Sequence, residues 1–96
     1  MSRYLLAPEA WEDLDELQRY LLSERPEAVG HVMAGLRRGM EFVAEDPRVG
    51  RQRRFGDRLL RVWVVWSWVI IYDDSREPVE VVRIIHGARD FEQIFE

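Results

Sequence analysis

Three runs rich in valine, isoleucine and tryptophan follow one another in the second half of the chain and restrict its fold most strongly. They cover residues 59–65, 68–73 and 79–86, and such side chains are enriched in strands. Residues 73–78 supply ordinary turn chemistry between the last two runs. Trp66-Ser67 lacks the Gly, Asn or Asp that a tight hairpin prefers. We still predict a hairpin there, with Trp66 exposed or covered by a partner, because one strand of about fifteen residues would be too long.

The first half carries two helical patterns joined by a short turn. Residues 3–6 form a brief apolar run that predicts a strand, and Pro8 suits a helix start. Apolar residues recur at helical spacing over 8–22, and again from about residue 26 until Asp46-Pro47. The short link predicts an antiparallel helical hairpin. Gly30, Gly35 and Gly39 in the second helix indicate either close packing against the first helix or a tolerated weakness.

These patterns predict one α+β domain over residues 1–96, in the order β-α-α-β-β-β with a short C-terminal helix or tail. The three consecutive strands should form an antiparallel meander, with the helical hairpin on one face and the N-terminal strand beside the same sheet. Ninety-six residues with 47% apolar composition suit a single core. The chain has no cysteine, which suits the cytoplasm. Neither a signal peptide nor a membrane span is expected, and we predict no metal or cofactor site.

The net charge of −4 conceals a basic segment in an acidic body. Residues 48–64 contain six arginines against Asp57 alone, whereas residues 1–47 contain five arginines against ten acids. Such a chain is a poor general binder of nucleic acid, because non-specific affinity scales with the phosphates neutralised. We expect residues 49–58 to be irregular. Arg51, Arg53 and Arg54 there suit a solvated loop and an acidic partner equally well.

Local signatures spread over nearly the whole chain resemble toxins of the ParE/RelE superfamily from bacterial toxin–antitoxin operons, and ParE-like members most. The matching segments are Pro8-Glu9-Ala10 with Asp13-Leu14, Asp46-Pro47 with Gly50-Arg51, Leu60-Arg61 with residues 69–72, and residues 79–90 with His86-Gly87-Ala88-Arg89-Asp90. The resemblance implies one of two activities. RelE-like members cut messenger RNA in the ribosomal A site, and ParE-like members inhibit DNA gyrase. In both cases an antitoxin wraps the toxin and silences it.

A metal-independent endoribonuclease would need an acid or base and cations for the developing phosphorane charge. His86 is the candidate acid or base, and Arg61, Arg83 and Arg89 are candidates to hold the phosphate. The tail argues against this activity. RelE-like nucleases carry a tyrosine near the C-terminus, whereas Phe91 and Phe95 have no hydroxyl, and the chain contains no lysine.

Structural roles compete with these chemical ones. His86 can end its strand by hydrogen-bonding its own loop, where Gly87 favours a tight turn. Strand alternation puts Arg83 on the face of Val79, Val81 and Ile85, where we expect it to pair with an acid such as Asp90. His31 is expected to be an ordinary surface residue.

The tryptophans point to a protein partner. Alternation places Trp66 and Trp68 on one side of the sheet and Trp63 on the other. A four-stranded sheet covered on one face cannot bury all of them, so its open face should carry an apolar groove. These three residues are our candidates for antitoxin binding.

The sequence thus favours a ParE-like toxin that acts by binding a protein, with DNA gyrase as the expected target, and not by catalysis. The candidate target-binding residues are Arg51, Arg53, Arg54, Arg61, Arg89, Phe91 and Phe95. The expected antitoxin is ParD-like, with a ribbon-helix-helix start, in a hetero-oligomer of the kind that serves plasmid stabilization. Two alternatives stay open: a RelE-like ribosome-dependent endoribonuclease, and a non-toxic relic that retains only antitoxin binding.

Overall fold

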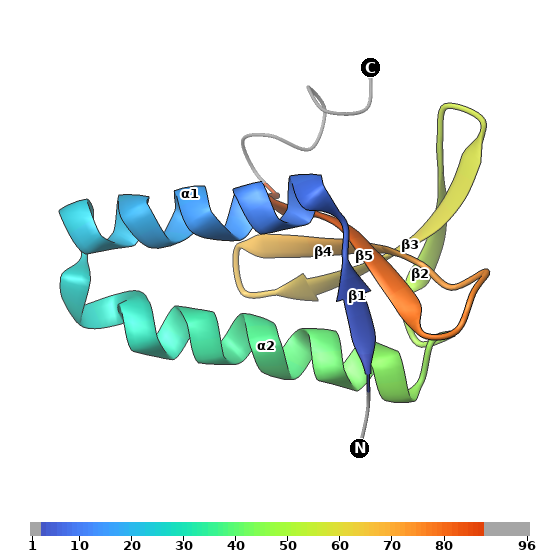
Figure 1. Cartoon of the computed structure of the whole chain (residues 1–96), viewed down its shortest axis with the longest axis horizontal. Helices are drawn as coiled ribbons and strands as arrows, with labels where there is room; N and C mark the ends of the chain where they lie inside the picture. The colour runs from blue at the N-terminus through green and yellow to red at the C-terminus, as the bar shows by residue number, and fades with distance from the viewer. Residues whose placement is uncertain (1–2, 88–96) are drawn as a thin grey trace.

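A helical hairpin and a five-stranded sheet make up residues 3–87, the part of the chain that the computed structural model describes (Figure 1). The order of elements confirms the predicted α+β fold, with one strand more than expected. The elements are β1 (Tyr4–Leu6), α1 (Pro8–Glu24), the 3-10 turn η1 (Pro26–Ala28), α2 (Val29–Glu45), β2 (Arg51–Phe55), β3 (Arg58–Val65), β4 (Trp68–Asp73) and β5 (Val79–His86).

The two helices are antiparallel and begin and end close to the predicted positions (Figure 1). Pro8 opens α1, where its missing N–H is no loss. Ala10 and Leu21 are buried on the inner side of α1. On α2 the buried side chains are Val32, Leu36, Met40 and Val43. The helices thus contribute one apolar side each to a shared core.

The sheet order is β1-β5-β4-β3-β2 within the described residues. The antiparallel meander β3-β4-β5 is confirmed. The N-terminal strand β1 lies parallel to β5, with Tyr4 opposite Val79 and Leu6 opposite Val81. It covers only the first part of β5, and α1 runs along the remainder of that strand (Figure 1).

The expectation that residues 49–58 are irregular is wrong. Residues Arg51–Phe55 form β2, which pairs with β3 from Arg51↔Val62 to Phe55↔Arg58. Gly56 and Asp57 make the two-residue turn, in which Gly56 adopts φ 63°. Arginine carries little strand preference of its own, so the pairing comes from β3 and from the burial of Phe55. The β2-β3 hairpin projects beyond the helices (Figure 1).

A register shift in β5 divides its side chains between the two faces differently from a regular strand. Arg83 lies opposite Ile71 and Val81 opposite Tyr72, so Val82 is an extra residue. Val79, Val81 and Ile84 consequently join the core under the helices, whereas Ile85 joins a second cluster on the far face of the sheet. The predicted common face of Val79, Val81, Arg83 and Ile85 is therefore wrong.

Close packing explains Gly35 and Gly39 of α2. They pack against the β3-β4 hairpin, however, and not against α1, the packing partner considered from the sequence. A Cβ at Gly35 would overlap the ring of Trp66, and one at Gly39 would lie 2.7 Å from Val65 Cγ2. Gly30 has nothing within 4 Å, so it carries no packing role.

The tip of the β3-β4 hairpin folds onto α2. Trp66 adopts φ 54°, a conformation rarely taken by residues other than glycine, and its ring stacks on His31 with centroids 4.8 Å apart. His31 is exposed, as expected for a surface residue, and its ring also packs against Trp66. The tip tryptophan is half exposed, at 52%.

Candidate functional site

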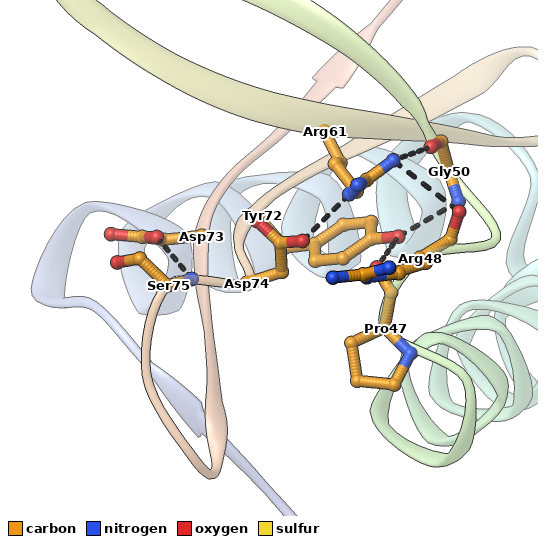
Figure 2. A network of polar contacts seen from close by, with 8 residues as sticks. All are labelled: Pro47, Arg48, Gly50, Arg61, Tyr72, Asp73, Asp74 and Ser75. Atoms are coloured by element: carbon orange, nitrogen blue, oxygen red, sulfur yellow. Dashed lines mark hydrogen bonds and ion pairs between the residues drawn. The ribbon is translucent and has the colours of Figure 1, made fainter.

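Arg61 joins three segments at the base of the projecting hairpin (Figure 2). Its Nε donates to Asp74 Oδ2 at 2.7 Å, and its Nη1 donates to the carbonyl oxygens of Gly50 at 2.8 Å and Arg48 at 3.3 Å. The side chain is only 14% exposed. Arg61 therefore ties β3 to the α2-β2 connection and to the β4-β5 turn.

Tyr72 completes this junction from the neighbouring strand. Its hydroxyl accepts a hydrogen bond from Gly50 N and donates one to Pro47 O, both at 2.9 Å. Burial raises the pKa of the Tyr72 phenol above its ordinary value, and the bond from Gly50 N only partly opposes the effect. A Cβ on Gly50 would lie 2.5 Å from the Tyr72 oxygen, so glycine is required at this contact. The junction is rigid and well bonded.

The arginines of β2 lie on the outer strand that this junction supports. Arg51, Arg53 and Arg54 are all exposed. By the pairing with β3, Arg51 and Arg53 share the face of Val62 and Leu60, whereas Arg54 shares the opposite face with Leu59. The Arg53 guanidinium lies over the Phe55 ring, 6.0 Å from its centroid. The three guanidinium groups thus flank both faces of one strand and do not form a single cluster.

Arg58 at the start of β3 contacts Asp73, with Nη2 3.3 Å from Oδ2. Burial by itself raises the pKa of Asp73, but the hydrogen bonds from Ser75 and Arg58 outweigh it and hold the pKa below its ordinary value. Ser75 N donates to Asp73 Oδ1 at 2.9 Å, which closes the β4-β5 turn (Figure 2).

Arg83 forms the predicted ion pair, but with Asp13 of α1. Arg83 Nε donates to Asp13 Oδ2 at 2.7 Å and Nη2 to Oδ1 at 2.9 Å, while Ile84 N donates to Oδ2 at 2.9 Å. The hydrogen bond to Asp13 raises the pKa of Arg83, although burial opposes the rise. Asp90, the partner suggested by the sequence, lies outside the described residues.

A cleft of about 530 Å³ opens between α1 and the paired ends of β4 and β5. Its lining is mixed, with Leu17, Tyr20 and Trp68 beside Asp13, Glu16, Arg25, Arg83 and His86. His86 meets the edge of the Trp68 ring, with centroids 6.0 Å apart at 82°. Its Nδ1 is buried and has no hydrogen-bond partner among residues 3–87, whereas Gly87 N donates to Ser67 O at 2.8 Å. Gly87, and not the His86 Nδ1, therefore supplies the loop bond that we expected.

The structure brings together only some of the nuclease candidates. His86 and Arg83 both line the cleft. Arg61 pairs with Tyr72 near the far end of β4, whereas His86 pairs with Trp68 at its start. Four residues of strand separate those positions by about 13 Å. Arg89 lies outside the described residues, as do the target-binding candidates Phe91 and Phe95.

All three candidate tryptophans of the hairpin turn towards the helices, so their expected division between two faces is wrong. Trp63 and Trp68 pack against the core under the helices, and Trp66 stacks on His31. The hairpin turn reverses the chain between Trp66 and Trp68, so strand alternation does not carry across it. The far face holds Phe55, Leu60, Val69, Ile71 and Ile85 instead, each at most 8% exposed.

Trp63 and Trp66 nevertheless leave part of their surface open. Phe42 of α2 is 44% exposed and contacts Trp63, with centroids 5.0 Å apart. Trp66 contacts α2 at His31, and Trp63 contacts α2 at Phe42. We call Phe42, Trp63 and Trp66 together the α2 aromatic surface.

Sequence reasoning missed Asp13 and Asp74 as the partners of Arg83 and Arg61, and it missed Tyr72 as the residue that bonds to Gly50 and Pro47. Asp13 resembles any acid in the first turns of a helix, and no spacing connects it to a residue 70 positions later. Tyr72 reads as one more apolar strand residue. Among residues 3–87, no group of three or more His, Cys, Asp or Glu side chains is arranged to hold a metal ion. No helix in that range is long and apolar enough to cross a membrane.

The fold and the site describe a small α+β protein that presents a basic strand and an aromatic surface. A family model described as the ParE toxin of the type II toxin-antitoxin system, parDE, matches residues 4–91. The chain therefore belongs to the ParE toxin family of type II toxin–antitoxin systems, and the resemblance read from its sequence is confirmed. Membership implies the toxin role and an antitoxin partner.

One curated relative is similar over most of both chains. It is protein Y4kP of Sinorhizobium fredii (strain NBRC 101917 / NGR234), whose name classes it as a candidate toxin. The two are 28% identical over 81 residues, which cover 84% of this chain and 83% of the relative.

Proposed function

We propose that this toxin arrests growth by binding a protein target, with DNA gyrase as the target, and that a tightly bound antitoxin neutralises it. Gyrase is proposed because it is the target that the ParE resemblance implies. The site of action would then be the cytoplasm. The toxin would carry out no bond-breaking chemistry itself.

The observation that carries the proposal is the exposure of the β2 arginines on a firmly supported hairpin. Arg51 and Arg54 extend from an outer strand whose base is held by the Arg61–Tyr72 junction. A rigid support reduces the ordering cost of association, and guanidinium groups spaced along both faces of one strand favour an acidic protein surface. Such a construction suits binding.

The bonding of the other arginines also supports binding over RNA cleavage. Arg61 donates hydrogen bonds from Nε to Asp74 and from Nη1 to Gly50 O. Arg83 donates from Nε and Nη2 to Asp13. A phosphate held between them would have to compete with these internal acceptors. Arg61 is therefore better explained as a residue that positions the hairpin than as a direct contact with the target.

The antitoxin part of the proposal rests on the α2 aromatic surface and Trp68. Exposed aromatic side chains such as Phe42, at 44%, and Trp66, at 52%, are typical of protein interfaces. An antitoxin segment with apolar anchors would cover Phe42, Trp63 and Trp66 on α2 and the hairpin tip. We propose a ParD-like antitoxin, with a ribbon-helix-helix start, in a hetero-oligomer.

The test is to induce the chain alone in bacteria and compare plasmid supercoiling with the 5′ ends of translated messages. The double variant R51E/R54E removes the basic strand surface, and R38E/R76E makes the same charge change at exposed positions elsewhere. Purified gyrase is assayed in parallel for supercoiling with each protein.

Loss of supercoiling and growth arrest with the wild type and with R38E/R76E, but not with R51E/R54E, is the expected result. New message ends in the ribosomal A site would overturn the proposal in favour of the endoribonuclease. Growth without arrest, at normal levels of folded protein, would indicate the non-toxic relic.

A further inference from the structure

The outer edge of β2 offers a row of backbone groups in addition to its charges. Within residues 3–87, β2 is the last strand of the sheet order and pairs with β3 on one side. A strand in that position leaves alternate N–H and C=O groups directed outward. Its five residues, Arg51–Phe55, span about 17 Å.

The side chains along this edge select the kind of strand that can be added. Arg51 and Arg53 extend on one face and Arg54 on the other, and β2 contains no acidic residue. Like charges directly opposite one another destabilise a strand pair, whereas opposite charges stabilise it. A second copy of this chain pairing through β2 would bring arginine against arginine. The edge therefore disfavours self-association and favours an acidic strand.

The position of the hairpin keeps the edge accessible to a partner. The β2-β3 hairpin projects beyond the helices (Figure 1), and the exposed Arg51, Gln52, Arg53 and Arg54 follow one another along it. Its base is held by the Arg61 and Tyr72 bonds to Pro47 and Gly50. The edge is thus presented in a fixed direction, which lowers the cost of ordering a partner on it.

We propose that β2 receives an extended acidic segment of the toxin's protein target as a sixth strand of the sheet. Backbone hydrogen bonds to the β2 edge would supply affinity, and carboxylates opposite Arg51, Arg53 and Arg54 would supply selectivity. The inference rests on the proposed function, because it takes the β2 arginines as the binding surface. It adds the form of the partner: an extended acidic chain.

A peptide probe tests the strand addition on the purified chain and depends neither on a growth assay nor on gyrase. The probe is a blocked seven-residue peptide of alternating valine and glutamate, titrated into the ¹⁵N-labelled full chain at low salt. Two control peptides replace glutamate by lysine or N-methylate every amide, which keeps the charges but removes the donors. Amide hydrogen exchange in Arg51–Phe55 is the readout, because strand addition protects outward amides whereas charge attraction alone does not.

The glutamate peptide is expected to slow exchange of the outward β2 amides at least about tenfold at saturation. Both control peptides should leave the exchange rates unchanged. R51E/R54E should weaken binding of the probe about tenfold, whereas R38E/R76E should not. These variants keep the backbone edge, so the comparison isolates the charges.

Several outcomes would overturn the inference. They are peptide binding without slower β2 exchange, equal protection by the N-methylated peptide, equal protection by a single-stranded oligonucleotide of the same charge, self-association through β2, or no binding at all. If the peptide result holds while gyrase is unaffected, the proposed target fails and the strand addition stands. If gyrase is inhibited without peptide protection, the reverse is true.

Discussion

Arg83 and Asp13 form a two-bond ion pair across 70 positions of the chain, with donor–acceptor distances of 2.7 and 2.9 Å. The same carboxylate accepts a bond from Ile84 N, beyond the part of β5 that β1 covers. One acidic side chain of α1 therefore satisfies both a partly buried guanidinium and a strand edge. This contact connects the helical hairpin to the sheet on the side of the cleft.

Replacing Asp13 by asparagine should destabilise the protein by about 2 kcal/mol, because Arg83 would lose its charged partner in a partly buried site. Urea denaturation measures the change. Asp15→Asn is the matched control, since Asp15 forms an exposed i,i+4 pair with Arg19. That control should cost no more than about 0.5 kcal/mol. Equal stability of the two variants would show that the Asp13 pair contributes nothing special.

Gly35→Ala should cost about 1–3 kcal/mol, because the new methyl group would meet the Trp66 ring. Gly30→Ala places the same methyl group in open space and should stabilise α2 by up to about 1 kcal/mol. Combining Gly35→Ala with Trp66→Ala should remove much of the penalty that Gly35→Ala adds. Denaturation of the wild type, Gly35→Ala, Trp66→Ala and the double variant forms a double-mutant cycle. Strictly additive changes in stability would contradict the contact between Gly35 and Trp66.

Tyr72→Phe should lower the free energy of unfolding by about 1–2 kcal/mol, because Gly50 N and Pro47 O lose their common partner. Tyr20→Phe removes an exposed hydroxyl and should change stability by less than about 0.5 kcal/mol.

The same phenol predicts a dependence on alkaline pH. The pKa of Tyr72 is raised above 10.0 in the folded protein, so its contribution is complete below pH 10.0 and is lost as the pH rises towards the folded-state pKa. As the pH rises above 10.0, the wild type should therefore lose stability more steeply than Tyr72→Phe. Parallel curves for the two proteins would argue against the raised pKa.

His86→Phe should leave stability unchanged or raise it by about 1 kcal/mol, because it removes a buried nitrogen with no hydrogen-bond partner in the part of the chain that the structure describes. The aromatic contact with Trp68 can persist. Growth arrest should also survive in a toxin that acts by binding. A stable His86→Phe protein that no longer arrests growth would instead support the endoribonuclease.

Much of the secondary structure follows from local patterns. Trp68–Asp73 and Val79–His86 begin and end as expected, because long runs of β-branched residues have few other stable arrangements. Pro8 and Asp46-Pro47 mark the limits of the helical hairpin through backbone constraints that act within one or two residues. The family could also be read from the order of these segments.

The candidate site was less accessible to such reasoning. The sequence drew attention to Arg61, Arg83 and His86 because of their chemistry, but it did not indicate what each one contacts. Arg61 and Arg83 bond to acids or carbonyl groups in other elements, and His86 Nδ1 is buried with no partner within residues 3–87. The β2 strand was missed because its stability comes from pairing with β3.

Local sequence patterns establish the helical hairpin, the β3-β4-β5 meander and the basic segment, since each depends on neighbours along the chain. Three further features appear only in the folded chain: Val82 shifts the faces of β5, Trp66 turns onto α2 and the arginines line an outer strand. They depend on hydrogen bonds and packing between residues far apart in sequence. Many distant partners are compatible with the same local pattern, and the folded chain selects among them.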